Sequence, residues 1–260
     1  MNNLLQYVKR QMDWHYQVPG ELSRPSHRYK SCAVVGNSGV LQKSQRGPEI
    51  DQHEMVIRLN NAINVYNRNR TYLNEHIGAK TTMTFMNSHI LQSCLRKFHR
   101  CRCHPYGVDV PIMVYLCAPQ HALSVACCSF EHETPIFLTD GRFDAFVSRL
   151  ATFHSLKHFL DSGKGNITQW EDTHQHEFHY SSGFQAVITA LALCEKVDLY
   201  GFGKHPQAKH HFHSFQPREH YAHDFEVEYL FYKDLEAGRI YENPFLCEAG
   251  VYIPKVTLFQ

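Results

Sequence analysis

Short apolar runs alternate with stretches of helical periodicity from residue 31 onward. Five runs have the length, composition and flanking turn residues of buried strands: Ser31–Val35, Met55–Leu59, Thr81–Phe85, Ile112–Cys117 and Val197–Tyr200. Apolar residues recur at helical spacing over Phe143–Asp161, ending near Gly163, and over Gln185–Glu195. Strands separated by helices predict an α/β fold with a mainly parallel sheet, whose ligand loops lie at the carboxyl ends of the strands.

Residues 1–30 lack this alternation. A short amphipathic pattern at Leu4–Met12 is followed by Pro19 and Pro25, which interrupt it. No internal repeat or low-complexity segment is present in the sequence. We therefore expect a lead-in or stem remnant over residues 1–30 and a single domain over residues 31–260.

The composition is that of an ordinary globular domain, with 43 % hydrophobic and 20 % charged residues in 260. The net charge of +1 gives no support to a nucleic-acid-binding or anionic-membrane surface. Twenty histidines make the surface charge sensitive to pH between about 5 and 7. No apolar run reaches the roughly 18 residues of a membrane span. Either the protein is soluble as it stands, or an N-terminal anchor lies outside this sequence.

The sequence contains cysteines and two glycosylation sequons, and the sequons fit a secretory compartment. The nine cysteines are an odd number, so at least one thiol is free or paired outside the chain. Sequons begin at Asn69 and Asn166. Such triplets also occur by chance.

The first predicted strand ends in the loop Gly36-Asn37-Ser38-Gly39, and Asn60 follows the next strand. Glycines let a backbone approach an anion closely, so one interpretation is a phosphate or nucleotide site. The alternative is a tight structural turn. The dinucleotide fingerprint G-x-G-x-x-G is absent, and the loop pattern by itself favours the turn.

Hydroxyl groups also precede a helix at Tyr180–Phe184, which contains Ser181, Ser182 and Gly183. Such residues are ordinary helix caps. They also suit an anion site, because the free amides and the positive dipole end of a helix attract negative charge. The local sequence favours capping.

Two histidine-containing segments, Lys209–His213 and His223–Glu228, carry candidate acid–base groups. Surface or packing histidines are the alternative. Zinc is a further candidate because other groups contain ligand types: His174, His176, His179 and Cys101–His104. However, the sequence has no H-E-x-x-H and no paired C-x-x-C.

Carboxylates follow His223 closely, and we expect one of them to orient its ring or raise its pKa: Asp224, Glu226 or Glu228. The alternative is that His223 caps or packs against the helix predicted by Phe225 and Tyr229.

In order along the chain, these segments resemble the four motifs of the sialyltransferase family of animals and plants, glycosyltransferase family 29. "CAVVGNSGVL", "GPEID" and "RLNNA" within residues 32–62 are similar to the long motif. "SSGFQAVITALALCEKVDLYGFG" is similar to the short motif, "HHFH" stands at the third, and His223 with Glu228 matches the very short motif. The resemblance covers about residues 31–240.

This resemblance implies a variant of the GT-A fold, with a seven-stranded, mostly parallel sheet between helices. It implies inverting transfer of sialic acid, or a related acidic keto-sugar such as Kdo, from a CMP-sugar donor to a glycan hydroxyl, without a metal or other cofactor. It also implies residue roles: Asn37 and Asn60 would contact the donor's phosphate and nucleotide, Ser181, Ser182 and Gly183 would hold the donor, His211 would bind the leaving phosphate, and His223 would be the base.

The resemblance further implies a disulfide between Cys32 and Cys194. It implies a Golgi-lumenal enzyme, expected in full-length form as a type II membrane protein that acts on glycoprotein, glycolipid or polysaccharide.

The chain departs from the family pattern at four positions: Val40, Lys209, Phe212 and His213. The family pattern places these positions near the donor or the acceptor, so the identity of the donor sugar stays open. Two competing classes follow from the residues: a catalytically inactive sialyltransferase-like binding protein and a zinc-dependent hydrolase.

Overall fold

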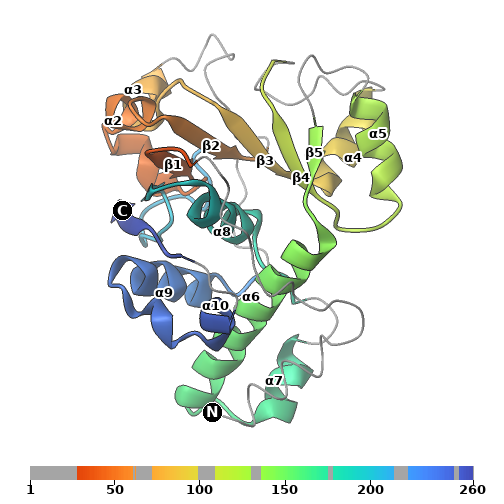
Figure 1. Cartoon of the computed structure of the whole chain (residues 1–260), viewed down its shortest axis with the longest axis vertical. Coiled ribbons are helices and arrows are strands. Elements are labelled where there is room, and N and C mark those ends of the chain that lie inside the picture. Colours follow the sequence, from red (N-terminus) through yellow and green to blue (C-terminus); the bar gives the residue numbers. More distant parts are fainter. Residues whose placement is uncertain are drawn as a thin grey trace.

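The structure is a computed structural model that describes residues 28–60, 62, 72–98, 109–129, 136–174, 178–213, 222–248 and 252–259. The described residues form a seven-stranded sheet in the order β5-β4-β3-β2-β1-β6-β7 (Figure 1). The strands are β1 (Cys32–Val35), β2 (Met55–Leu59), β3 (Met83–Asn87), β4 (Ile112–Tyr115), β5 (Ile136–Leu138), β6 (Lys196–Tyr200) and β7 (Lys255–Phe259). The pairings between neighbouring strands of the described residues are parallel. The carboxyl ends of these strands therefore share one edge of the sheet.

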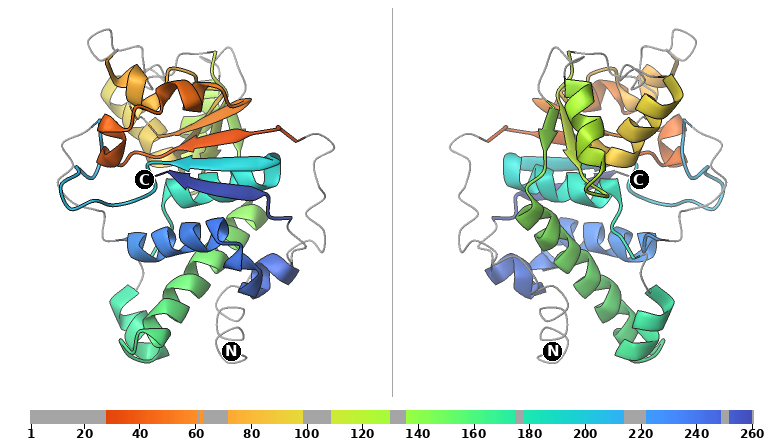
Figure 2. Two further views of the ribbon diagram at one scale, coloured as in Figure 1. Left: turned by 90° about the vertical axis from the view of Figure 1, so that its left-hand side faces the viewer. Right: turned by 90° about the vertical axis from the view of Figure 1, so that its right-hand side faces the viewer.

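Helices cover both faces of the sheet (Figure 2). One face carries α2 (Gly47–Asp51), α3 (Asn74–Ile77), α4 (Ser88–Phe98) and α5 (His121–Ser129). The other carries α6 (Gly141–Asp161), α8 (Ser182–Leu193), α9 (Phe225–Glu236) and α10 (Pro244–Glu248), with α7 (Ile167–His174) packed on α6. Short 3₁₀ segments are η1 (Gly39–Lys43) and η3 (Arg239–Glu242). Within the described ranges, no helix combines the length and apolar character needed to cross a membrane.

The central strands are buried on both faces, as expected for a parallel sheet between two helical layers. In β1, Cys32 and Val34 join the cluster under α6, α8 and α9, whereas Ala33 and Val35 join the cluster under α2 and α3. All four side chains are at most 2 % exposed. This is why the first strand is apolar at every position instead of alternating.

A disulfide joins Cys32 in β1 to Cys194, which directly follows α8, with the Cα atoms 6.0 Å apart. The expected pairing of these two cysteines is therefore present. Tyr29 forms an isolated parallel bridge with Cys194, and its N–H donates to the carbonyl of Leu193 at 3.0 Å. Residues 28–30 thus attach to the sheet, while the rest of the expected lead-in lies outside the described residues.

The predicted strands are present, and the first, second and fifth match within one residue. The third starts two residues later than expected and extends to Asn87. The helix expected at Gln185–Glu195 starts earlier, at Ser182, because Ser181 caps it. Strands β5 and β7 were not predicted. In β5, Phe137 and Leu138 are exposed, so the strand lacks the buried apolar run that marks the others.

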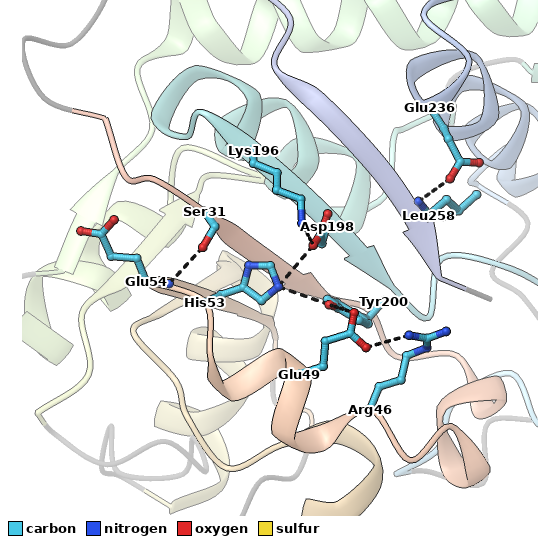
Figure 3. Close-up of polar contacts among 10 residues, drawn as sticks. All are labelled: Ser31, Arg46, Glu49, His53, Glu54, Lys196, Asp198, Tyr200, Glu236 and Leu258. Carbon is cyan, nitrogen blue, oxygen red and sulfur yellow. Dashed lines mark hydrogen bonds and ion pairs between the residues drawn. The ribbon is translucent and has the colours of Figure 1, made fainter.

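A buried polar network lies on the α2 side of β6 (Figure 3). Asp198 accepts from Lys196 Nζ at 2.7 Å and lies 3.4 Å from Nε2 of His53. Nε2 of His53 is also 3.2 Å from the hydroxyl of Tyr200, which donates to Glu49 at 3.2 Å. Burial lowers the pKa of His53. These contacts fasten the α2–β2 segment to β6 on the face opposite α8.

Candidate active site

A cavity of about 600 Å³ lies at the carboxyl edge of the sheet. Its walls come from residues at the ends of β1, β2, β3 and β6, the first turn of α8, and the segments around 210–213 and 223–232. Every residue to which the resemblance gave a donor-binding or catalytic role lines it: Asn37, Asn60, Ser181, Ser182, Gly183, His211 and His223. Segments that are far apart in the sequence therefore converge on one site.

The glycines of the loop after β1 serve close packing of backbone against backbone. A Cβ atom on Gly36 would lie 2.6 Å from the carbonyl oxygen of Gly201, and one on Gly39 would lie 2.4 Å from that of Lys209. The N–H of Gly39 donates to the same Lys209 carbonyl at 2.9 Å. The structural interpretation thus accounts for the glycines, and the residues between them face the cavity.

Asn37 lines this cavity. Its Oδ1 atom is buried and has no hydrogen-bond partner among the described residues. A buried polar atom without a partner is costly unless a ligand or water satisfies it. The Oδ1 atom of Asn37 is therefore an unsatisfied acceptor buried in the wall of the cavity.

Asn60 sits directly after β2 in the left-handed region, with φ of 53°. Its Nδ2 donates to Ser182 Oγ at 3.3 Å, and its Oδ1 accepts from the N–H of Asn87 at 3.0 Å. Asn87 also donates to Ser182 Oγ at 3.3 Å. These contacts hold Asn60 in a conformation that asparagine tolerates better than most residues. Sequence reasoning missed Asn87, although its place at the end of β3 was a usable signal.

The amino end of α8 opens onto the cavity. Ser181 caps the helix by accepting from the N–H of Phe184 at 3.1 Å, whereas Ser182 and Gly183 form the first turn. Capping and cavity lining are therefore combined in one segment. The twelve-residue helix directs its positive end toward the site, where it favours an anion.

Glu228 in α9 holds Ser181 in place. The N–H of Ser181 donates to Oε1 of Glu228 at 2.7 Å, and the Ser181 hydroxyl donates to Oε2 at 2.5 Å. Tyr232 donates to the same carboxylate at 3.4 Å. Burial outweighs these hydrogen bonds and raises the pKa of Glu228 to about 7.

His211 lies among other histidines at the cavity wall. Its ring stacks on that of His210 with centroids 4.2 Å apart, and on that of His213 at 5.1 Å. Burial, with the two neighbouring rings, lowers the pKa of His211 to about 4. The imidazole is therefore neutral at pH 7. A phosphate beside it would raise the pKa again.

The ring of His223 is oriented by a backbone carbonyl. Nδ1 of His223 lies 2.5 Å from the carbonyl oxygen of His179, and the N–H of His179 donates to the carbonyl of Ala222 at 2.8 Å. A carbonyl only accepts, so Nδ1 carries the proton and Nε2 carries the lone pair of the neutral ring. Backbone contacts of this kind leave no signature in the sequence, which is why the role of His179 was missed.

The carboxylates expected to orient His223 have other partners. Glu228 binds Ser181, and Glu226 lies 3.9 Å from both His158 and Lys164. Asp224 caps α9 and accepts from the hydroxyl of Ser155 at 2.6 Å. The ring of His223 is therefore oriented by the His179 carbonyl, where a neighbouring carboxylate was expected. His223 itself precedes the α9 cap.

Three of the four departures from the family pattern do not line the cavity. Val40 belongs to η1, Lys209 is exposed and contributes its carbonyl to the Gly39 contact, and Phe212 is buried in the core under α2 and α3. His213 is the departure that reaches the cavity wall.

The described residues contain no group of three or more histidine, cysteine, aspartate or glutamate side chains arranged to hold a metal ion. His174 instead stacks on Trp170, with ring centroids 4.7 Å apart, and His179 stacks on Tyr115. His176 and Cys101–His104 lie outside the described residues. Within the described part of the chain, nothing supports the zinc-site hypothesis.

The fold and cavity define a parallel α/β domain with its site at the strands' carboxyl edge. A family model described as glycosyltransferase family 29 (sialyltransferase) matches residues 1–240. A β-1,6-galactosyltransferase, GALT29A, of Arabidopsis thaliana is 45 % identical over 91 % of this chain and 57 % of its own length. Sialyltransferase-like protein 2 of Oryza sativa subsp. indica is 45 % identical over 90 % and 60 %. The chain thus spans about three fifths of these relatives.

A crystal structure of a mammalian sialyltransferase in complex with Gal-β-1-3GalNAc-ortho-nitrophenol has a TM-score of 0.53 to this structure. It is 21 % identical, and the match covers 100 % of this chain and 86 % of that one. This likeness shows the fold. The chain belongs to glycosyltransferase family 29.

Proposed function

We propose that this chain is the catalytic domain of an inverting glycosyltransferase that moves sialic acid, or a related acidic keto-sugar such as Kdo, from a CMP-sugar donor to a glycan hydroxyl. The observation that carries the proposal is the convergence of Asn37, the amino end of α8, His211 and His223 on one cavity. Anion-binding groups and an oriented imidazole are the two elements that such a reaction needs.

The donor's phosphate would be held without a metal or other cofactor. Asn37 supplies a polar amide, α8 supplies backbone N–H groups and its dipole, and His211 supplies a hydrogen-bond donor that gains a proton as negative charge arrives. As the glycosidic bond breaks, charge develops on the departing phosphate. Groups already aimed at that charge lower the barrier without reorganising.

His223 would accept the proton of the acceptor hydroxyl. The His179 carbonyl holds Nδ1 as a donor, so Nε2 of the neutral ring is the basic atom. Attack by the acceptor on the face opposite the departing phosphate inverts the anomeric centre. A general base of this kind contributes about 10²–10⁴-fold.

A galactose donor is the second candidate, because a relative at 45 % identity is named as a β-1,6-galactosyltransferase. A product-release assay comparing CMP-sialic acid, CMP-Kdo and UDP-galactose separates the two. Release of CMP with sugar transfer supports the proposal, and transfer from UDP-galactose alone replaces it with galactosyl transfer. Binding of CMP without transfer from any donor identifies the inactive binding protein.

We also propose that the full-length protein acts in the Golgi lumen as a type II membrane protein. The Cys32–Cys194 disulfide supports an oxidising compartment. Tagged full-length protein should coincide with a Golgi marker, and its C-terminal tag should resist protease added outside sealed vesicles. A protease-sensitive C-terminal tag would reverse the proposed orientation.

A further inference from the structure

The turn between α6 and α7 carries an acceptor triplet for N-linked glycosylation that the proposed reaction does not use. The triplet is Asn166-Ile167-Thr168, with threonine at its third position and no proline at its second. Asn166 and Thr168 are exposed, whereas Ile167 packs against the core cluster under α6, α8 and α9. The turn lies at the end of α6 that is remote from the sheet (Figure 1). The two residues that define the triplet are therefore open to solvent.

Asn166 also starts α7, and its side chain uses only the oxygen of its amide to do so. Oδ1 of Asn166 accepts from the N–H of Gln169 at 3.0 Å, and Oε1 of Gln169 accepts from the N–H of Asn166 at 2.8 Å. These reciprocal contacts form a capping box, and the main-chain carbonyl of Asn166 accepts from the N–H of Trp170 at 3.0 Å. Among the described residues, Nδ2 of Asn166 has no hydrogen-bond partner. The nitrogen to which an N-linked glycan is attached is therefore not required by the fold.

We propose that Asn166 is an N-glycosylation site and carries a glycan in the folded protein. The inference rests on the lumenal compartment proposed above, because the co-substrate, an oligosaccharide linked to a lipid diphosphate, is used in the lumen of the endoplasmic reticulum. Asn166 precedes α8 and β6, so it enters that lumen before β1 can pair with β6. The completed fold leaves it exposed.

The attachment reaction leaves the cap of α7 intact. Nδ2 of Asn166 forms a bond to the anomeric carbon of the oligosaccharide, the bond from that carbon to the diphosphate oxygen breaks, and the lipid diphosphate departs with the electron pair. The amide nitrogen gives up one of its two protons. The product keeps one N–H and the whole of Oδ1, so the contact with Gln169 persists. Glycosylation and helix capping are therefore compatible at this residue.

The position of Asn166 also keeps a glycan clear of the candidate active site. Asn166 is not among the residues that line the cavity of about 600 Å³. That cavity lies at the carboxyl edge of the sheet, whereas the turn before α7 lies beyond the far end of α6 (Figure 1). The glycan adds a hydrophilic cover to the outer end of the α6–α7 pair and leaves the cavity open.

The test uses the whole 260-residue chain behind a cleavable signal peptide, which delivers it to the lumen whatever its natural targeting. The secreted protein is treated with peptide N-glycosidase in heavy-oxygen water, which converts a glycosylated asparagine into a labelled aspartate. Peptide mass spectrometry should find the label at Asn166 in most of the molecules. It locates the glycan independently of the second triplet at Asn69, which lies outside the described residues.

Three variants separate the glycan from the helix cap. Thr168→Ala destroys the triplet and should abolish the label at Asn166, whereas Thr168→Ser retains the triplet and should keep the label. Asn166→Asp removes the acceptor nitrogen but caps α7 as well as asparagine does. This variant should lose the glycan and still be secreted, which excludes misfolding as the cause of the loss.

Secreted protein with an unlabelled Asn166 would overturn the site. Cell-free translation of the Asn69→Gln variant with microsomes gives the same information for chains that are secreted poorly. The absence there of a glycan that depends on Thr168 would also overturn it. The compartment is tested separately, with the full-length protein and its own targeting sequence. If Asn166 is glycosylated behind the added signal peptide but not in the full-length protein, the site stands and the proposed lumenal compartment fails.

Discussion

The carbonyl oxygen of His179 lies 2.5 Å from Nδ1 of His223 and thereby fixes the tautomer of that ring. His179 directly precedes Tyr180 and the Ser181 cap, so the segment that starts α8 also orients the proposed base. The donor side and the proton-accepting side of the cavity are consequently coupled through three successive residues. Replacing His223 therefore tests this coupling as well as the proposed proton transfer from the acceptor hydroxyl.

Replacing His223 by alanine should lower turnover by about 10²–10⁴-fold, because the proton acceptor is lost from the transition state. Affinity for CMP should stay near that of the unchanged protein. His223→Asn is the control, since its amide can donate to the His179 carbonyl but cannot act as a base. Steady-state kinetics with the active donor measures turnover, and calorimetry with CMP measures the affinity. Normal turnover in the asparagine variant would remove His223 from the role of base.

Binding of a cytidine phosphodiester should take up protons through His211. The pKa of His211 is about 4, and an adjacent anion raises it. Affinity should therefore weaken as pH rises through the bound-state pKa. The methyl ester of CMP is the suitable ligand, because a phosphodiester does not titrate in this range. Calorimetry near pH 5.5 in buffers of different ionisation enthalpy reports the proton uptake.

His211→Asn should abolish this proton uptake while retaining a neutral donor. We also expect His211→Ala to reduce turnover by about two orders of magnitude or more, the range for groups that stabilise developing charge. A binding enthalpy that does not depend on the buffer in the unchanged protein would contradict the predicted protonation of His211.

Glu228 should make folding stability fall with rising pH. Its pKa of about 7 in the folded protein lies above the ordinary glutamate value of 4.5, so the folded state holds the proton more tightly than the unfolded chain does. The contribution is complete below about pH 4.5 and is lost as pH rises through about 7. Asp224 and Tyr232, which face the carboxylate, remain when Glu228→Gln is made. The difference in unfolding free energy between the two proteins should change by roughly 2–3 kcal/mol across this window.

Urea unfolding of the unchanged protein and Glu228→Gln at pH 4.5 and pH 7.5 measures that difference. Comparing the two proteins at each pH cancels the contributions of other titrating groups. The glutamine variant should gain relative stability at the higher pH. If the unfolding free energies of the two proteins changed with pH by the same amount, Glu228 would titrate alike in the folded and unfolded states.

The Cys32–Cys194 disulfide closes a separation of 162 residues. A loop of this length contributes about 4–5 kcal/mol in the chain-entropy model. Reduction of the folded protein, or the double replacement of both cysteines by alanine, should lower the unfolding free energy by an amount of this order. Cys127→Ala removes an exposed free thiol and serves as the control. Equal unfolding free energies of the oxidised and reduced protein would show that the disulfide does not contribute to stability.

The parallel sheet and most of its buried strands follow from the sequence, because Cys32–Val35 is apolar at every position and Met55–Leu59 at every position except Arg58. Strand β7 escaped prediction since only Val256 among its residues is buried. The order in which strands pair depends on contacts between distant segments, and periodicity does not encode it. Ordered motifs nevertheless identified seven of the residues that line the cavity.

The finer arrangement of the site was beyond sequence reasoning for a related reason. Glu228 was one of three carboxylates considered for His223 because they are close to it in the sequence, yet its carboxylate binds Ser181. The contact between His223 and His179 involves a main-chain oxygen, which every residue type possesses. Local spacing identifies candidate groups, whereas the direction of each side chain depends on helix packing.

The pairing of β1 with β6 has a consequence for how the protein is made. Cys32 lies beside Val197 in the sheet, so the central strand gains its second neighbour only after most of the chain has been synthesised. Contacts between such distant segments make folding slow. Until then, the apolar edge of β1 can pair with non-native segments, and the thiol of Cys32 can form a non-native disulfide. Formation of the Cys32–Cys194 disulfide should therefore follow completion of β6. A nascent chain that ends before Tyr200 has neither the complete β1–β6 pairing nor a complete cavity.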